Sequence, residues 1–93
     1  MYERSKEAVA KRLKALMDAY EIRTQKELCD MIEESPSKVN QYLRAVHYPR
    51  IETASKICDK FNVTLDWIFH GKTGGLSVGL SKSLDEHSDE TTA

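Results

Sequence analysis

Glycine and proline are scarce in this sequence, which has only four and two of them among 93 residues. So few turn-forming residues in a short chain favour helices over a fold of many strands and turns. Long apolar runs are missing as well, since no stretch approaches the roughly 18 consecutive apolar residues of a membrane-spanning helix. Residues 1–12 carry charges with no apolar run behind them, which argues against a signal peptide. We therefore expect one all-α, cytoplasmic domain with no membrane partner.

Patterns for metal binding and catalysis are also missing. The two cysteines, Cys29 and Cys58, form no C-x-x-C pair and fall inside helical patterns, which is typical of reduced, buried thiols in a cytosolic protein. His47, His70 and His87 have no ligand spacing with each other or with the cysteines. A domain this small has little room for an enzyme cleft. We predict no metal, no cofactor and no enzymatic activity.

Positive charge is in no large excess, because the formal net charge is −1. Residues 1–72 hold thirteen Lys/Arg and eleven Asp/Glu, a net +2, whereas residues 73–93 hold one lysine and four acids, a net −3. An acidic tail of this kind can mask a basic face. We predict a folded domain at 1–72, a candidate dimerisation segment at 73–84 and a disordered acidic tail at 85–93.

What the sequence does contain is apolar residues at helical spacing in five segments. The first segment runs from about Lys6 to Tyr20, and its Lys11, Arg12 and Lys14 point away from the apolar stripe toward solvent. The apolar residues of the other four segments are Leu28, Cys29 and Ile32; Val39, Tyr42 and Leu43; Ile51, Ala54, Ile57, Cys58 and Phe61; and Leu65, Ile68 and Phe69.

Polar residues mark the starts of three of these helices. Thr24 and Glu27 have the spacing of a capping box, which opens the second helix. Ser35 is an N-cap followed by Pro36 at the first helical position, where the missing N–H does no harm. Thr64 is the expected cap of the fifth helix.

The second and third helices are separated only by Glu33 and Glu34, so they must meet through a tight turn. Two short helices of this kind form a helix-turn-helix layout, in which the second enters the major groove of DNA. The face of the third helix opposite its apolar residues carries Ser37, Gln41 and Arg44, whose side chains are able to contact bases. An ordinary solvated helix face is the alternative interpretation.

Five motifs follow one another in a fixed order. They are Arg12-Leu13-Lys14, Thr24-Gln25-Lys26-Glu27-Leu28, Ser35-Pro36-Ser37-Lys38-Val39, Pro49-Arg50-Ile51-Glu52-Thr53-Ala54 and Leu65-Asp66-Trp67-Ile68. With these motifs, the stretch from Val9 to Gly71 resembles the Cro/repressor-type helix-turn-helix family, also called the XRE family, and its end is similar to the phage-repressor branch. The resemblance implies a five-helix, lambda-repressor-like fold that binds double-stranded DNA.

The resemblance also implies which residues contact DNA. Gln25 is similar to the family's glutamine that binds a phosphate and braces the third helix. Gln41 suits the N6/N7 edge of adenine, and Lys38 suits guanine O6/N7 or a phosphate. The implied base contacts are Ser37, Lys38 and Gln41. The implied backbone contacts are Gln25, Asn40, Arg44, His47 and Arg50.

Three residues depart from the family pattern. Glu33 stands where the family usually has glycine, and a left-handed conformation at a non-glycine residue costs about 1 kcal/mol. Glu33 and Glu34 place two acids near the expected DNA face, where they would weaken phosphate contacts. Pro36 cannot supply a polar side chain to read a base. Finally, the net charge of residues 1–72 is only +2, from which we expect modest non-specific affinity for DNA.

The function implied is a sequence-specific transcriptional regulator of the nucleoid or a phage-infected host. Its simplest form is a repressor of phage or mobile-element type, bound to a palindromic operator as a homodimer. Leu76, Val78 and Leu80 alternate like a short strand, and we assign them with Trp67 and Phe69 to the dimer surface. One alternative is an antitoxin-like regulator with a protein partner. The other is a protein-interaction module that has lost DNA binding.

Overall fold

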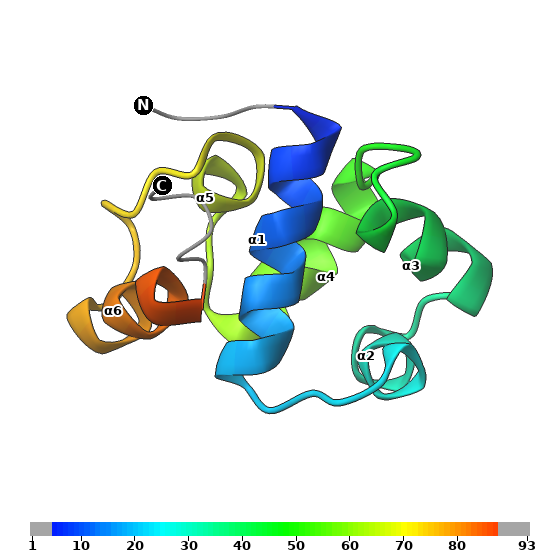
Figure 1. Cartoon of the computed structure of the whole chain (residues 1–93), viewed down its shortest axis with the longest axis horizontal. Coiled ribbons are helices and arrows are strands. Elements are labelled where there is room, and N and C mark those ends of the chain that lie inside the picture. The colour runs from blue at the N-terminus through cyan, green and yellow to red at the C-terminus, as the bar shows by residue number, and fades with distance from the viewer. Residues whose placement is uncertain (1–4, 88–93) are drawn as a thin grey trace.

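The computed structural model describes the backbone of residues 5–87 and the side chains of residues 5–84 (Figure 1). Within this range the chain forms six α-helices and no strand. The helices are α1 (Lys6–Ala19), α2 (Gln25–Ile32), α3 (Pro36–Leu43), α4 (Ile51–Phe61), α5 (Leu65–His70) and α6 (Val78–His87). The prediction of an all-helical domain is confirmed, although the sequence patterns predict only the first five helices.

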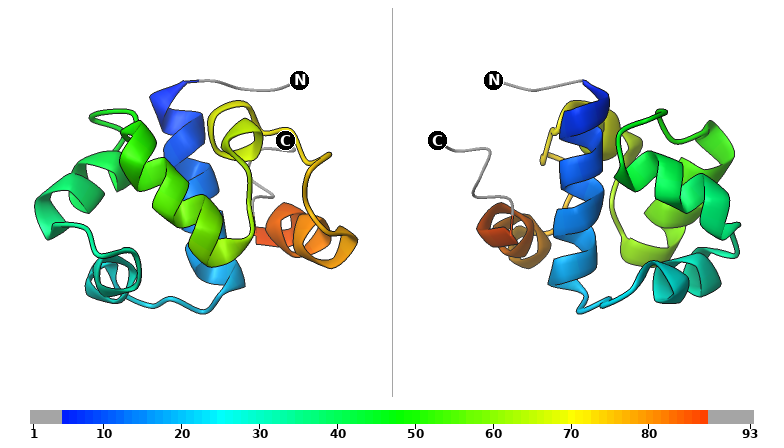
Figure 2. Two further views of the ribbon diagram at one scale, coloured as in Figure 1. Left: turned by 180° about the vertical axis from the view of Figure 1, so that it is seen from behind. Right: turned by 45° about the vertical axis from the view of Figure 1, so that its right-hand side comes forward.

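α1 runs through the middle of the molecule, and the other helices surround it (Figures 1 and 2). α2 and α3 lie on one side of α1, whereas α6 lies on the other side, toward the opposite end of the longest axis. α4 packs against α2 and α5, and α3 packs against α1 and α2. Because the longest axis measures 30 Å, most of the length of the domain separates α3 from α6.

The helix starts follow the polar residues placed before them. Thr24 Oγ1 accepts a hydrogen bond from the Glu27 amide at 3.1 Å, and Glu27 Oε1 accepts one from the Thr24 amide at 3.1 Å. The side chains of Ser35 and Thr64 each accept a hydrogen bond from the amide three residues later. Pro36 is the first residue of α3. The predicted caps are thus confirmed, because each oxygen satisfies an amide that has no partner inside its helix.

A single hydrophobic core joins the helices. Leu16, Ile57 and Phe61 are each no more than 2% exposed, and a fully buried side chain of this size contributes about 1.5–3 kcal/mol. The hydroxyl of Tyr20 donates a hydrogen bond to the carbonyl oxygen of Phe61 at 2.7 Å, and the two rings lie 4.9 Å apart. This contact ties the end of α1 to the end of α4.

Both cysteines are free thiols. Cys29 is buried, as expected, and Cys58 is only half-buried. Burial raises the pKa of each thiol above its ordinary value of 9.0, and Asp30 beside Cys29 and Asp59 beside Cys58 raise it further. The thiols are therefore weak nucleophiles at neutral pH.

The prediction that Arg12 points toward solvent is wrong, because Arg12 is buried. Its side chain is 9% exposed, and Nη1 donates a hydrogen bond to the carbonyl oxygen of Ile68 at 3.0 Å. A long arginine stem packs on apolar surface while its head reaches a carbonyl at the end of a helix, where a cation is favourable. Gly71 adjoins this group, because a Cβ built there would lie 2.8 Å from Arg12 Nη2. That approach and a φ of +76° favour glycine.

The strand predicted at Leu76, Val78 and Leu80 is wrong, because α6 begins at Val78. The amide of Leu80 donates to Ser77 Oγ at 3.2 Å, as at a helix start. Leu84 is 1% exposed, and Leu76 and Leu80 pack against the core. These three leucines are spaced by four residues, which is the apolar stripe of a helix. A helix buries this stripe against α1, whereas a strand of three alternating residues would have no partner strand to pair with. Burial of the stripe therefore stabilises the helix over the strand.

The expected disordered tail begins at residue 85, but α6 continues to His87, so residues 85–87 are helical. The rest of that tail, 88–93, lies outside the described residues. In residues 5–87, no helix has the length and apolar character needed to cross a bilayer.

Candidate nucleic-acid interface

α2 and α3 are joined by a turn of three residues, 33–35. Glu33 ends α2 in the left-handed conformation, with φ 53° and ψ 51°. The amide of Glu34 donates to the carbonyl oxygen of Cys29 at 3.0 Å, which closes the end of α2. The turn is therefore formed despite the absence of glycine, at a conformational cost of about 1 kcal/mol. Contacts made by the rest of the turn must offset this cost.

α3 has a buried face and an outward face. Its three apolar residues are buried against the core. Ser37 and Lys38 are exposed, and Gln41 is half-buried. Hydroxyl, ammonium and amide groups are those that hydrogen-bond to base edges in the major groove. The three residues predicted to contact bases thus lie together on the outward side of α3.

The residues predicted to contact the DNA backbone lie on α2, α3 and the loop after α3. Gln25 is the first residue of α2 and is exposed. Asn40 is half-buried on α3, and Arg44 is the exposed C-cap of that helix. His47 and Arg50 are exposed in the loop that leads to α4. These positions leave each side chain except Asn40 largely accessible to a ligand.

Glu34 is not an exposed acid on this surface, because its side chain is only 10% exposed. Its Oε2 accepts a hydrogen bond from the Thr53 hydroxyl at 2.7 Å, and its Oε1 lies 3.5 Å from Lys38 Nζ. Lys56 Nζ is 3.7 Å from Oε2. The Thr53 hydrogen bond, helped by the Ser35 amide and the two lysines, holds the pKa of Glu34 below its ordinary 4.5 although burial opposes this. The charge of Glu34 is therefore balanced inside the protein.

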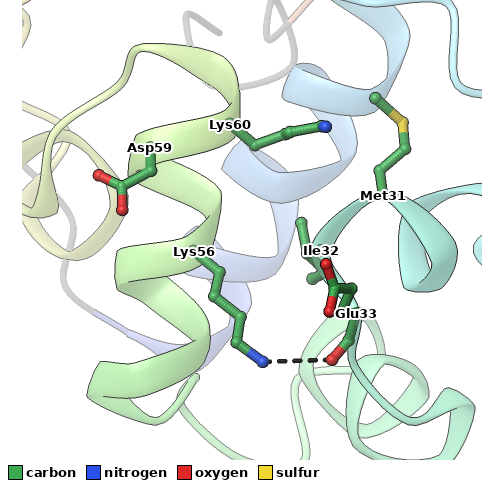
Figure 3. A pocket seen from close by; sticks show the side chains of 6 residues that line it. All are labelled: Met31, Ile32, Glu33, Lys56, Asp59 and Lys60. Atoms are coloured by element: carbon green, nitrogen blue, oxygen red, sulfur yellow. Dashed lines mark hydrogen bonds between the residues drawn. The ribbon is translucent and has the colours of Figure 1, made fainter.

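Lys56 also secures the backbone of the turn. Its Nζ donates a hydrogen bond to the carbonyl oxygen of Glu33 at 3.2 Å (Figure 3). An open depression of about 320 Å³ lies beside this contact. Its lining residues are Met31, Ile32, Glu33, Lys56, Asp59 and Lys60. Among the residues that the structure describes, no three His, Cys, Asp or Glu form a group that could hold a metal ion.

The five residues predicted for a dimer surface do not form one exposed patch. Trp67 is 4% exposed and belongs to the core, so it serves the fold of the single chain. Phe69, Leu76 and Leu80 are partly buried and pack against the same core. Val78 is 81% exposed. Only Val78 of this set offers most of its side chain to a partner.

Two groups of residues escaped the sequence patterns. Thr53 and Lys56 on α4 form hydrogen bonds to Glu34 and Glu33 of the turn. The sequence could have indicated Thr53, because it is a hydroxyl residue within the apolar stripe of α4. Val46, Tyr48 and Ile51 are 45%, 47% and 61% exposed in and after the α3–α4 loop. Val46 and Tyr48 lie in the loop and Ile51 is the first residue of α4, so three exposed apolar side chains follow α3 within six residues; we call this set the apolar loop.

Residues 16–68, from within α1 into α5, match the family described as Helix-turn-helix, of the XRE type. The chain belongs to this family. It is therefore an XRE-type DNA-binding transcription regulator, and the matched residues include all of α2, the turn and α3. The match ends before α6. Searches of curated proteins and of solved structures find no match.

Proposed function

We propose that this regulator is a repressor of phage or mobile-element type, which binds a pseudo-palindromic operator as a homodimer. The observation that supports a specific operator is the outward face of α3, where Ser37, Lys38 and Gln41 offer three different hydrogen-bonding groups. Gln41 would pair with the N6/N7 edge of adenine, and Lys38 with guanine O6/N7. Gln25, Arg44 and the α3–α4 loop would fix the register through phosphates.

We infer a homodimer from the small surface that one such module buries against DNA. One small module buries too little surface for tight specific binding, so two copies are expected on two half-sites. We take α3 as the recognition helix. Half-sites lie about 34 Å apart along the duplex, and the α3 helices of the two copies must face the same side of the duplex.

The dimer surface we propose is the apolar loop formed by Val46, Tyr48 and Ile51. If two copies met through α6 instead, most of the 30 Å length of each domain would separate the recognition helices. That separation exceeds one turn of DNA. The apolar loop directly follows α3, so contact there keeps the two recognition helices close.

The test is selection of bound duplexes from a random DNA pool, followed by affinity measurements against salt concentration. An enriched inverted repeat, with log K falling steeply as salt rises, supports a dimeric sequence-specific regulator. Enrichment of a single half-site contradicts the dimer. No binding even at low salt contradicts the proposal and favours a domain whose partner is a protein.

A further inference from the structure

Glu34 connects the turn, the recognition helix and α4. Its Oε2 accepts the hydroxyl hydrogen of Thr53 at 2.7 Å, and its Oε1 lies 3.5 Å from the Nζ of Lys38. Thr53 is 1% exposed and the Glu34 side chain is 10% exposed, so this hydrogen bond has little access to water. Lys56 Nζ approaches the same carboxylate at 3.7 Å and bonds to the preceding carbonyl (Figure 3). The carboxylate therefore has one fixed position relative to α3 and α4.

Lys38 is paired with this carboxylate but is still accessible. Its side chain is 46% exposed, compared with 10% for Glu34. A solvated lysine samples many rotamers, whereas an ion pair with a fixed acid four residues earlier restricts where its ammonium lies. An ordered ammonium can select a base edge, but a mobile one mainly follows the phosphates, which carry no sequence information.

We propose that Glu34 is a positioning residue for DNA recognition, which orients the ammonium of Lys38 and so sets the sequence selectivity of the recognition helix. The inference rests on the proposed function, since it requires Lys38 to face a base pair. In this arrangement Thr53 and Lys56 hold the acid from the α4 side, and the acid holds Lys38 on the DNA side. Removing the acid should weaken discrimination between sequences while leaving general DNA affinity equal or higher.

The test compares Glu34→Gln with Glu33→Gln in the full chain. Both remove one negative charge from the same turn, but only position 34 contacts Lys38, and glutamine there keeps an oxygen for Thr53. The readout is a ratio of two affinities, for the selected operator and for the operator altered at the base pair where Lys38→Met loses selectivity. We expect Glu34→Gln to lower this ratio roughly tenfold, a coupling typical of residues in one ion-pair network. Glu33→Gln should leave it unchanged.

Repeating the comparison in a Lys38→Met background separates positioning from a general structural effect. If Glu34 acts through Lys38, Glu34→Gln has no further effect on the ratio there. An equal loss in both backgrounds overturns the proposal, as does an unchanged ratio in the single variant. A Lys38→Met variant that keeps full selectivity at every base pair also overturns it.

Two further controls separate this inference from a failure of the variant to fold and from a failure of the chain to bind DNA. Should Glu34→Gln fail to fold, Thr53→Val removes the shortest hydrogen bond to the carboxylate without a change of charge. The ratio should then fall only when Lys38 is present, and an unchanged ratio overturns the proposal. A wild-type chain that binds no DNA overturns the proposed function and this inference together, whereas selective wild-type binding with an unchanged ratio in the variants overturns this inference alone.

Discussion

The guanidinium of Arg12 and the backbone carbonyl of Ile68 share a 3.0 Å hydrogen bond that joins α1 to the end of α5. Because Arg12 is 9% exposed, replacing it with Met should remove the donor and leave the carbonyl without it. We expect Arg12→Met to lower the free energy of unfolding by about 2 kcal/mol. Urea denaturation measures this loss. Lys11→Met, at an exposed neighbour, should stay within about 0.5 kcal/mol of wild type, and equal losses would contradict a specific role for Arg12.

Leu84 shows whether α6 is part of the core. Its side chain is 1% exposed, so Leu84→Ala should lower the free energy of unfolding by about 2–4 kcal/mol, the range for truncating a buried leucine. Val78 stands on the same helix and is 81% exposed, so Val78→Ala should change stability little. Denaturation of both variants gives the comparison. A Leu84→Ala variant as stable as Val78→Ala would show that α6 does not pack on α1 in solution.

The dimer surface can be tested with two aspartates. Ile51 belongs to the apolar loop and is 61% exposed, so Ile51→Asp should shift the mass measured by light scattering from dimer to monomer without unfolding the chain. Val78→Asp, on α6, should leave the dimer intact. The opposite pattern would move the interface to α6 and return the segment 73–84 to the role that the sequence suggested.

Base-reading and backbone-contacting residues should differ in what their loss does. Gln41→Ala should relax preference by about 1–3 kcal/mol at one base pair of the operator. Arg50→Ala should weaken binding to all sequences alike and reduce the slope of log K against log salt. Competition binding over single-base operator variants distinguishes these outcomes. A uniform loss from Gln41→Ala would mean that the recognition face is elsewhere.

Acid should destabilise the domain partly through Glu34. The hydrogen bond from Thr53 lowers the pKa of this carboxyl below 4.5 in the folded protein, so its contribution to stability is complete above that pH and is lost as the pH falls through the lowered pKa. We expect the stability gap between wild type and Glu34→Gln to be largest near neutral pH and to shrink in acid. Denaturation at a series of pH values tests this. A stability gap for Glu34→Gln that does not change with pH would contradict this contribution.

Short-range chemistry made most of this fold predictable. Thr24 and Glu27 cap each other within four residues, and Ser35 with Pro36 starts α3 by purely local geometry. The apolar stripes place the core faces for the same reason, since a helix repeats every 3.6 residues. The helices found in this way carry most of the residues implied as DNA contacts, whereas His47 and Arg50 lie in the loop between α3 and α4.

Contacts between distant residues were not predictable from spacing. Arg12 was assigned to solvent by its angle on the helix, but the length of its side chain lets it reach Ile68. Glu34 lies two residues before α3 in sequence, yet its strongest partner, Thr53, is 19 residues away. Leu84 was needed to recognise α6, because only with it do Leu76, Leu80 and Leu84 form a stripe of three leucines at a spacing of four residues.

α6 lies across α1 from α3, so the domain has a second face that is remote from α3. A label, surface tether or fused protein attached near Val78 would sit on that side, with α1 and the core between it and α3 (Figure 2). Immobilising the chain there would leave the helix-turn-helix pair open to solution. A tether on the α3–α4 loop would instead occupy the surface that we propose for both DNA and dimer contact.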